Sequence, residues 1–273
     1  MSQNLGGIGP LPTVGLLAFV FAALFVLERL APLRARRRSV WPRVLVNMGV
    51  ALSALVVALG LILPAVSALL AWTEASRFGV LQWFDLPASV ELVFGFLLLD
   101  VAYYGWHRAN HAVPLLWRFH AAHHIDPDLD VTTATRFHFG EMLFSVAFQA
   151  VQIVLLGVPA LTYVVYEVVF QAGTLFHHSN WRLPQRLEGK LNWLFVTPRM
   201  HGIHHSQVRH ETHSNFSVVF NVWDRVFRTL RLDVPQGRIV IGVPGYDREQ
   251  DNHLRRVLAA PFRRQRAYWQ GDN

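Results

Sequence analysis

Residues 89–111 read SVELVFGFLLLDVAYYGWHRANH, an apolar stretch that runs directly into two histidines four residues apart. The stretch is close to the roughly 20 apolar residues that cross a bilayer as a helix. On such a helix His107 and His111 lie on one face, in line with Asp100 and Tyr104. The segment therefore predicts a membrane helix over 89–106 whose continuation carries paired imidazoles.

Two further histidine clusters follow the first. They read His120-Ala-Ala-His123-His124 and His201-Gly-Ile-His204-His205. Spacings of three and four residues direct the imidazoles of each cluster to a common side of a helix, and neutral imidazole binds iron and zinc well. Eight imidazoles are too many for one ordinary site, so the clusters predict a centre of two metal ions. The predicted ligands are His107, His111, His120, His123, His124, His201, His204 and His205.

The composition is that of a membrane protein. Of 273 residues, 52% are hydrophobic and 16% are charged, against roughly 25% charged residues in soluble domains. Cysteine is absent, which excludes disulfides, iron–sulfur clusters and thiolate-ligated haem.

The first 28 residues contain no Lys or Arg, whereas arginines are concentrated in the segment after the first apolar stretch. They are Arg34, Arg36, Arg37, Arg38 and Arg43. Between two apolar stretches this run indicates a cytoplasmic loop rather than a nucleic-acid surface.

Other apolar stretches predict membrane helices at 11–33 and 44–72. The tract 142–176 is broken at Gly157-Val158-Pro159, and each half is short for a full crossing. We expect a helical hairpin, or two short spans, that returns the chain to the side of the histidines. The predicted fold is all-α and integral to the membrane, with three transmembrane helices and the hairpin. In a single domain over 1–273 it adds a cytoplasmic histidine-rich cap (107–141 and 177–230) and a basic C-terminal tail (231–273).

Several other polar residues are candidates for the site. His178, which follows the hairpin, is favoured over the adjacent His177 as a ninth ligand. His138 is either a further ligand or, with Glu141, a group that orients the ligand imidazoles. The remaining histidines stand in polar surroundings and are expected to be exposed. They are His210, His213 and His253.

Two acidic residues lie in or near apolar spans, where ionisable groups are costly and tend to be functional. They are Asp100 and Glu167. Asp100 accepts a hydrogen bond either from a ligand histidine or, in a purely structural role, from backbone or Tyr104. Asn180, two residues after His178, is a further candidate for orienting a ligand.

The type of ligand limits which metal ions the site can bind. A histidine-rich site with open positions favours iron and oxygen chemistry, and zinc is a possible substitute in a purified protein. Haem needs only two axial ligands, which would leave most of the histidines unexplained.

Over roughly residues 95–230 the sequence closely resembles the fatty acid hydroxylase / sterol desaturase superfamily of integral membrane di-iron enzymes. The resemblance is carried by the three histidine clusters with their flanking residues, by Phe137-His138-Phe139-Gly140-Glu141, His178-Ser179-Asn180, Asn215-Phe216 and Trp223-Asp224-Arg225-Val226-Phe227. It implies that the eight clustered histidines bind two irons, and it supports His178 as a further ligand. One departure is Phe139, since family members often have Pro at that position.

The resemblance also implies a function: O2-dependent hydroxylation of an unactivated C–H bond in a membrane lipid such as a sterol or fatty acyl lipid. The cofactors would be two iron ions, with O2 as co-substrate. No His-Pro-Gly-Gly sequence of a fused cytochrome b5 domain occurs, so a separate donor of ferredoxin or cytochrome b5 type, with its reductase, is expected. Likeness to the short bacterial members indicates a multi-pass protein of the bacterial inner membrane, with the metal site on the cytoplasmic side.

Three alternatives stay open at this point. The same centre could desaturate a lipid, because an oxidant that removes one hydrogen atom can remove a second. From other functional classes, the chain could be a haem-binding electron carrier, or a non-catalytic membrane protein that binds metal or lipid.

Overall fold

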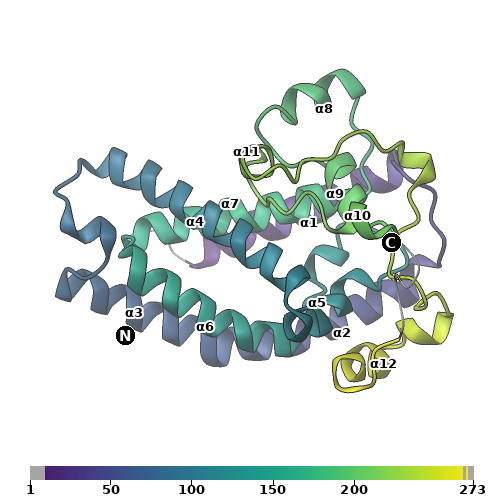
Figure 1. The fold of residues 1–273 in the computed structure, drawn as a ribbon, viewed down its shortest axis with the longest axis horizontal. Coiled ribbons are helices and arrows are strands. Elements are labelled where there is room, and N and C mark those ends of the chain that lie inside the picture. The colour runs from purple at the N-terminus through teal and green to yellow at the C-terminus, as the bar shows by residue number, and fades with distance from the viewer. Residues whose placement is uncertain (1–9, 267–268, 270–273) are drawn as a thin grey trace.

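The computed structural model describes residues 10–266 and 269, and this part of the chain is helical, with isolated bridges in place of a β-sheet. Figure 1 shows long helices running side by side and short helices gathered at one end. The long helices are α1 (Pro10–Leu30), α2 (Val40–Val57), α3 (Leu63–Ser76), α4 (Ala88–Ala112), α6 (Phe139–Leu156) and α7 (Ala160–His178).

Four of the helical segments are long and apolar enough to cross a membrane. They are Pro12–Leu30, Val40–Trp83, Ala88–Ala112 and Phe139–Leu156. The predicted class, an all-α integral membrane protein with a histidine-rich cap, is confirmed.

The second predicted span is longer than expected. Helices α2 and α3 continue into one another through a π-helical turn at Ala58–Ile62. The turn directly precedes Pro64, whose missing N–H and bulky ring disturb the hydrogen-bond ladder one turn earlier. At about 1.5 Å per residue the combined helix is about 55 Å long, so it extends beyond an apolar layer of about 30 Å.

The break in the tract 142–176 forms the predicted hairpin. Helix α6 ends at Gly157, which adopts a left-handed conformation with φ of 62°, and α7 begins after Pro159. A Cβ atom on Gly157 would lie 2.6 Å from the carbonyl oxygen of Phe78, so this glycine lets the hairpin tip pack against the connection between α3 and α4. The amide of Gln82 donates to the Gly157 carbonyl at 2.8 Å and holds the two turns together.

The hairpin forms the centre of the helical assembly. Helices α1 and α4 pack against α7, and α2 and α3 pack against α6. The core between them is rich in aromatic rings; Tyr103, for example, packs against Phe148 and Phe170 at centroid distances of 5.2 and 4.5 Å.

The end of the bundle opposite the hairpin tip carries the short helices (Figure 1). They are α5 (Pro114–His124), α8 (Gln185–Leu191), α9 (Pro198–His204), α10 (Arg209–Thr212), α11 (Val222–Val226) and α12 (Leu254–Ala259). Helices α5 and α9 each begin with proline, a position at which its missing N–H costs nothing. Helix α12 packs on α2, and the turn Ala260–Phe262 that follows it packs on α5, so part of the basic C-terminal region is folded onto the cap.

Candidate metal centre

Nine histidines converge in the cap as two groups. One group holds His107, His111, His120, His124 and His204, and the other holds His123, His178, His201 and His205. Within each group the candidate ligand nitrogens all lie within 4.8 Å of one another. The groups adjoin, since the rings of His124 and His205 stack with centroids 4.2 Å apart. The structure therefore brings together all eight clustered histidines and His178, whereas their binding of metal stays a prediction.

The second and third clusters each serve both groups. On α5, His120 and His124 belong to the five-histidine group, and His123 turns to the other. On α9 the arrangement is reversed, because His204 alone joins the five-histidine group. Residues four apart differ by about 40° around a helix and residues three apart by about 60° in the other sense, so the two adjacent histidines of each cluster diverge by about 100°. The His-x-x-His-His spacing thus directs imidazoles to two neighbouring centres.

Four of the nine imidazoles are held at Nδ1 by an oxygen acceptor. The pairs are His107 with the Phe216 carbonyl (2.7 Å), His120 with the Glu141 carboxylate (2.8 Å), His178 with the Thr174 carbonyl (2.8 Å) and His204 with the Ser214 carbonyl (2.7 Å). Donation from Nδ1 fixes the tautomer and leaves the Nε2 lone pair free, which is the usual arrangement of a metal-binding histidine.

The nitrogens face one another at a separation that fits a shared cation. His178 Nε2 lies 3.0 Å from the Nε2 atoms of both His123 and His201. Two imidazoles bound to one ion at about 2.0–2.1 Å and at right angles would place their nitrogens about 3 Å apart.

Several of these buried nitrogens have no hydrogen-bond partner. In the five-histidine group they are His120 Nε2, His204 Nε2 and both ring nitrogens of His111 and His124, and in the four-histidine group they are the Nδ1 atoms of His123, His201 and His205. Burying an unpaired polar atom costs free energy, and native proteins rarely leave one unsatisfied. An ion in each group would bind one nitrogen of each ring, so the residues present fit two metal ions.

The electrostatics of the cap favour neutral imidazoles. Burial lowers the pKa of His123, His201 and His204 well below the usual value, and repulsion between neighbouring imidazoles lowers it further. Near neutral pH these rings therefore carry no proton on the nitrogen that would bind a metal.

The loop 214–217 orients two of the ligands. Its carbonyls at Ser214 and Phe216 accept from His204 and His107. The buried carboxylate of Asp224 holds the loop by accepting from the backbone N–H groups of Phe216 (2.8 Å) and Ser217 (2.9 Å). This role was missed from the sequence; the available signal was an acidic residue within Trp223-Asp224-Arg225-Val226-Phe227.

Of the three residues predicted to orient ligands, Glu141 contacts a histidine and the other two do not. Asp100 accepts from the indole of Trp223 (2.8 Å) and the backbone N–H of Phe220 (3.2 Å), which is a structural role. Asn180 pairs with the backbone of Arg34 through both ends of its amide, at 2.9 Å each. Of the two roles left open for Asp100, the structural role with a bond from the backbone is therefore confirmed, whereas the prediction that Asn180 orients a ligand was wrong.

The other histidines lie outside both groups. His138 caps α6, because its Nδ1 accepts from the Gly140 N–H at 2.9 Å while its Nε2 lies 3.1 Å from the Leu258 carbonyl. Both ring nitrogens of His138 are thus engaged with the backbone. Neither of its predicted roles, as a metal ligand or as a group that orients one, is supported. His177 is buried with its ring 4.2 Å from that of His201.

The expectation of exposure holds for two of the three remaining histidines. His210 and His253 are exposed, whereas His213 is half-buried, with its ring 5.3 Å from that of Trp269 and 5.7 Å from that of His111. The prediction for His213 was wrong because the C-terminal region folds back over it.

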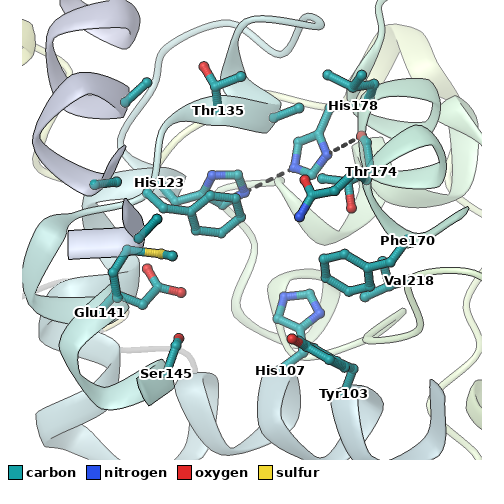
Figure 2. Close-up of a pocket in the computed structure, with 18 of the residues that line it drawn as sticks. Tyr103, His107, His123, Thr135, Glu141, Ser145, Phe170, Thr174, His178 and Val218 are labelled. Atoms are coloured by element: carbon teal, nitrogen blue, oxygen red, sulfur yellow. Dashed lines mark hydrogen bonds between the residues drawn. The ribbon is translucent and has the colours of Figure 1, made fainter. Parts of the chain in front are cut away.

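A cavity of about 460 Å³ adjoins the histidines. Figure 2 shows His107, His123 and His178 around it, with Glu141 and Ser145 from α6 facing Phe170 and Thr174 from α7. The cavity continues between the long helices as far as Leu17 and Ala58. The candidate metal centre therefore opens onto an internal space in the helical bundle.

The family model for fatty acid hydroxylases matches residues 92–229. The chain belongs to the fatty acid hydroxylase family. All nine histidines of the two groups lie within the matched segment, as does the loop that orients two of them. The predicted resemblance to the fatty acid hydroxylase / sterol desaturase superfamily is confirmed.

Curated relatives of this chain are named for different lipids. It is 32% identical to ornithine lipid hydroxylase OlsE of Rhizobium tropici over 62% of the chain and 50% of that protein. It is 32% identical to alkylglycerol monooxygenase of Xenopus tropicalis over 55% of the chain and 32% of that protein. With human cholesterol 25-hydroxylase the identity is 30% over 51% of each chain.

The chain thus spans about half or less of the length of these three relatives. No solved structure matches this family member significantly.

A substitution of Glu141 tests its role in this hydroxylase fold. In Glu141→Leu, His120 loses its acceptor, and we expect iron affinity to fall about 10–100-fold, as is typical when a ligand's orienting partner is removed. Glu141→Gln keeps an acceptor oxygen and should lose less. The measurement is iron competition against a chelator, with Ser145→Ala, one turn along α6, as the control. Unchanged affinity in Glu141→Leu would contradict the assignment.

Proposed function

We propose that this protein is a membrane lipid hydroxylase that uses O2 and two iron ions. In the proposed reaction a C–H bond, O2, two electrons and two protons yield an alcohol and water. The observation that carries the proposal is the pair of histidine groups, with their unpaired nitrogens, at the wall of a cavity within the helical bundle. The relatives named as hydroxylases and monooxygenases of lipids support it.

Iron held by the two groups would supply the activation of O2, which side chains alone do not perform. The chain's own residues position the ions and the lipid. Glu141 and the carbonyls of Ser214 and Phe216 fix three imidazoles. Apolar residues on α1 and α2, such as Phe21 and Leu55, line the cavity and would hold a hydrocarbon chain and exclude water.

Hydroxylation is favoured over desaturation because the named relatives add oxygen to their substrates. The electrons would come from a separate donor of ferredoxin or cytochrome b5 type. We further propose that the cap faces the cytoplasm, since the arginine-rich connection between α1 and α2 lies at the same end of the bundle.

The test is lipid mass spectrometry of a host with and without the full chain, grown under 18O2, together with iron analysis of the purified protein. We expect a lipid that gains one oxygen atom derived from O2, and two irons per chain. A lipid that only loses two hydrogens would identify a desaturase. A Soret band without non-haem iron would instead support a haem carrier.

A further inference from the structure

The cavity beside the histidines has a polar wall, although it lies between the long helices. Helix α6 contributes Glu141, Ser145 and Gln149 at intervals of four residues, so they share one face. Helix α7 contributes Glu167 and Gln171, also one turn apart. The hairpin therefore presents two lines of polar side chains that lead away from the metal centre.

The opposite wall is apolar. Helix α1 lines it with Leu17 and Phe21, and α2 lines it with Ala51, Ala54 and Leu55. Because the alanine side chains are small, this face of α2 leaves space beside the polar wall. The cavity thus has the form expected for an amphipathic molecule with a hydrocarbon part and at least one polar group.

Glu167 is the carboxylic acid that α7 contributes to the polar wall. It stands eleven residues before His178 on the same helix, which corresponds to about 16 Å along the axis. Its carboxyl group accepts from the Tyr103 hydroxyl at 3.2 Å, from the Gln171 amide and from the Tyr163 hydroxyl, all of which are neutral donors.

No cation balances this carboxyl group within the cavity. Among the residues that the structure describes, no Lys or Arg lines the cavity, and its carboxylic acids are Glu141 and Glu167. An ionisable side chain placed this deep in an apolar bundle is costly, and such side chains usually serve function.

We propose that Glu167, with Tyr103 and Gln149, binds a hydrogen-bond-donating polar group of the lipid substrate, namely a hydroxyl or an ammonium group. This inference rests on the proposed lipid hydroxylation and names the class of lipid. An anionic group such as a phosphate or carboxylate is rejected there, because it would meet a carboxyl group and no cation.

Binding of four probes of equal chain length tests the proposal without any need for turnover. The full chain in phosphatidylcholine nanodiscs is heated with 1-hexadecanol, hexadecylamine, hexadecane or hexadecanoate. At a probe concentration about tenfold above Kd, we expect the alcohol or the amine to raise Tm by about 3–6 °C. The alkane and the carboxylate should raise it much less.

Variants of Glu167 test whether this residue causes the larger rise in Tm with the alcohol and the amine. Glu167→Leu should abolish the advantage of the alcohol and the amine over the alkane. Glu167→Gln keeps an acceptor, so it should retain binding of a hydroxyl group and lose binding of an ammonium group. The control is Glu91→Leu, which removes a carboxyl group of α4 that does not line the cavity.

Equal shifts with alcohol and alkane in the wild-type protein, or an alcohol advantage that survives in Glu167→Leu, would overturn the proposal. These outcomes are separate from the test of hydroxylation. Oxidised lipid without the probe preference would refute the role of Glu167 alone, whereas the preference without any oxidised lipid would refute the proposed reaction alone.

Discussion

Replacing His204 by alanine is expected to remove one of two iron ions and to lower turnover by more than about 100-fold. His204 belongs to the five-histidine group, where its Nε2 has no other partner and its Nδ1 is fixed by Ser214. Loss of a ligand should weaken iron binding at least as much as loss of an orienting partner, which typically costs 10–100-fold. The reaction as proposed uses both ions, so a single empty group is enough to stop it.

Replacing His123 by alanine should have the same effect on turnover through the other ion, since His123 belongs to the four-histidine group. In each variant, metal analysis of the purified protein should find about one iron per chain instead of two. The matched control is His210→Ala, because His210 is exposed on α10 and belongs to neither group. This control should keep both irons and wild-type turnover.

The two variants also test the division into groups. If both kept two irons and full activity, the ligand assignment would be wrong. If each variant lost both irons together, the two groups would not hold separate ions, and the histidines would form one cooperative site.

The convergence of the histidines could be predicted because it depends on local spacing and on chain direction. Intervals of three and four residues place imidazoles on one side of a helix, and Gly157 with Pro159 predicted the turn that returns α7 to the cap. The division into groups of five and four could not be predicted. It depends on how α5 and α9 are rotated about their axes, which tertiary packing decides.

Neither Asp100 nor Asn180 orients a ligand, and the two cases have a common cause. Asp100 lies seven residues before His107, about 10 Å along α4, so its carboxylate reaches Trp223 instead of an imidazole. Asn180 stands close to His178 in sequence, yet its amide pairs with the backbone of Arg34. In both cases the partner is more than 100 residues away, and a single sequence does not show such a pairing.

The arginine-rich segment 34–43 has a second role that its sequence did not reveal. Beyond the topology signal, Arg34 donates to the Pro198 carbonyl next to the third histidine cluster, and the backbone of Arg37 donates to the Asp128 carboxylate at 2.8 Å. Arg43 is buried and pairs with acidic residues that follow the second cluster. This basic segment is therefore tied to the cap by hydrogen bonds and by the buried Arg43, although Arg36 and Arg37 are exposed.

The acidic partners of Arg43 lie in the segment that connects α5 to α6. Its guanidinium is 2.7 Å from the Asp126 carboxylate, is paired closely with Asp130 and lies 3.9 Å from Asp128. The amide of Asn47 also donates to Asp126, at 2.9 Å. All three carboxylates are buried. Since Asp126 follows the second histidine cluster by two residues, this network fixes the end of α5.

Arg43→Leu is expected to destabilise the protein by about 3–5 kcal/mol, because it leaves buried carboxylates without their cation. The expected fall in Tm is about 10 °C or more in nanodiscs. Arg36→Leu removes the same charge from an exposed position of the same segment, so it should change Tm little. Asp130→Asn added to Arg43→Leu should recover part of the loss, since it removes a buried charge whose ion-pair partner is Arg43.

Iron content separates the role of Arg43 from that of a ligand. At a temperature well below Tm, Arg43→Leu should still bind two irons, because none of its contacts is with a histidine. A Tm equal to that of Arg36→Leu would show that the buried network contributes nothing to stability. Loss of iron without a fall in Tm would mean that Arg43 acts on the metal centre itself and not through the packing of the segment 125–138.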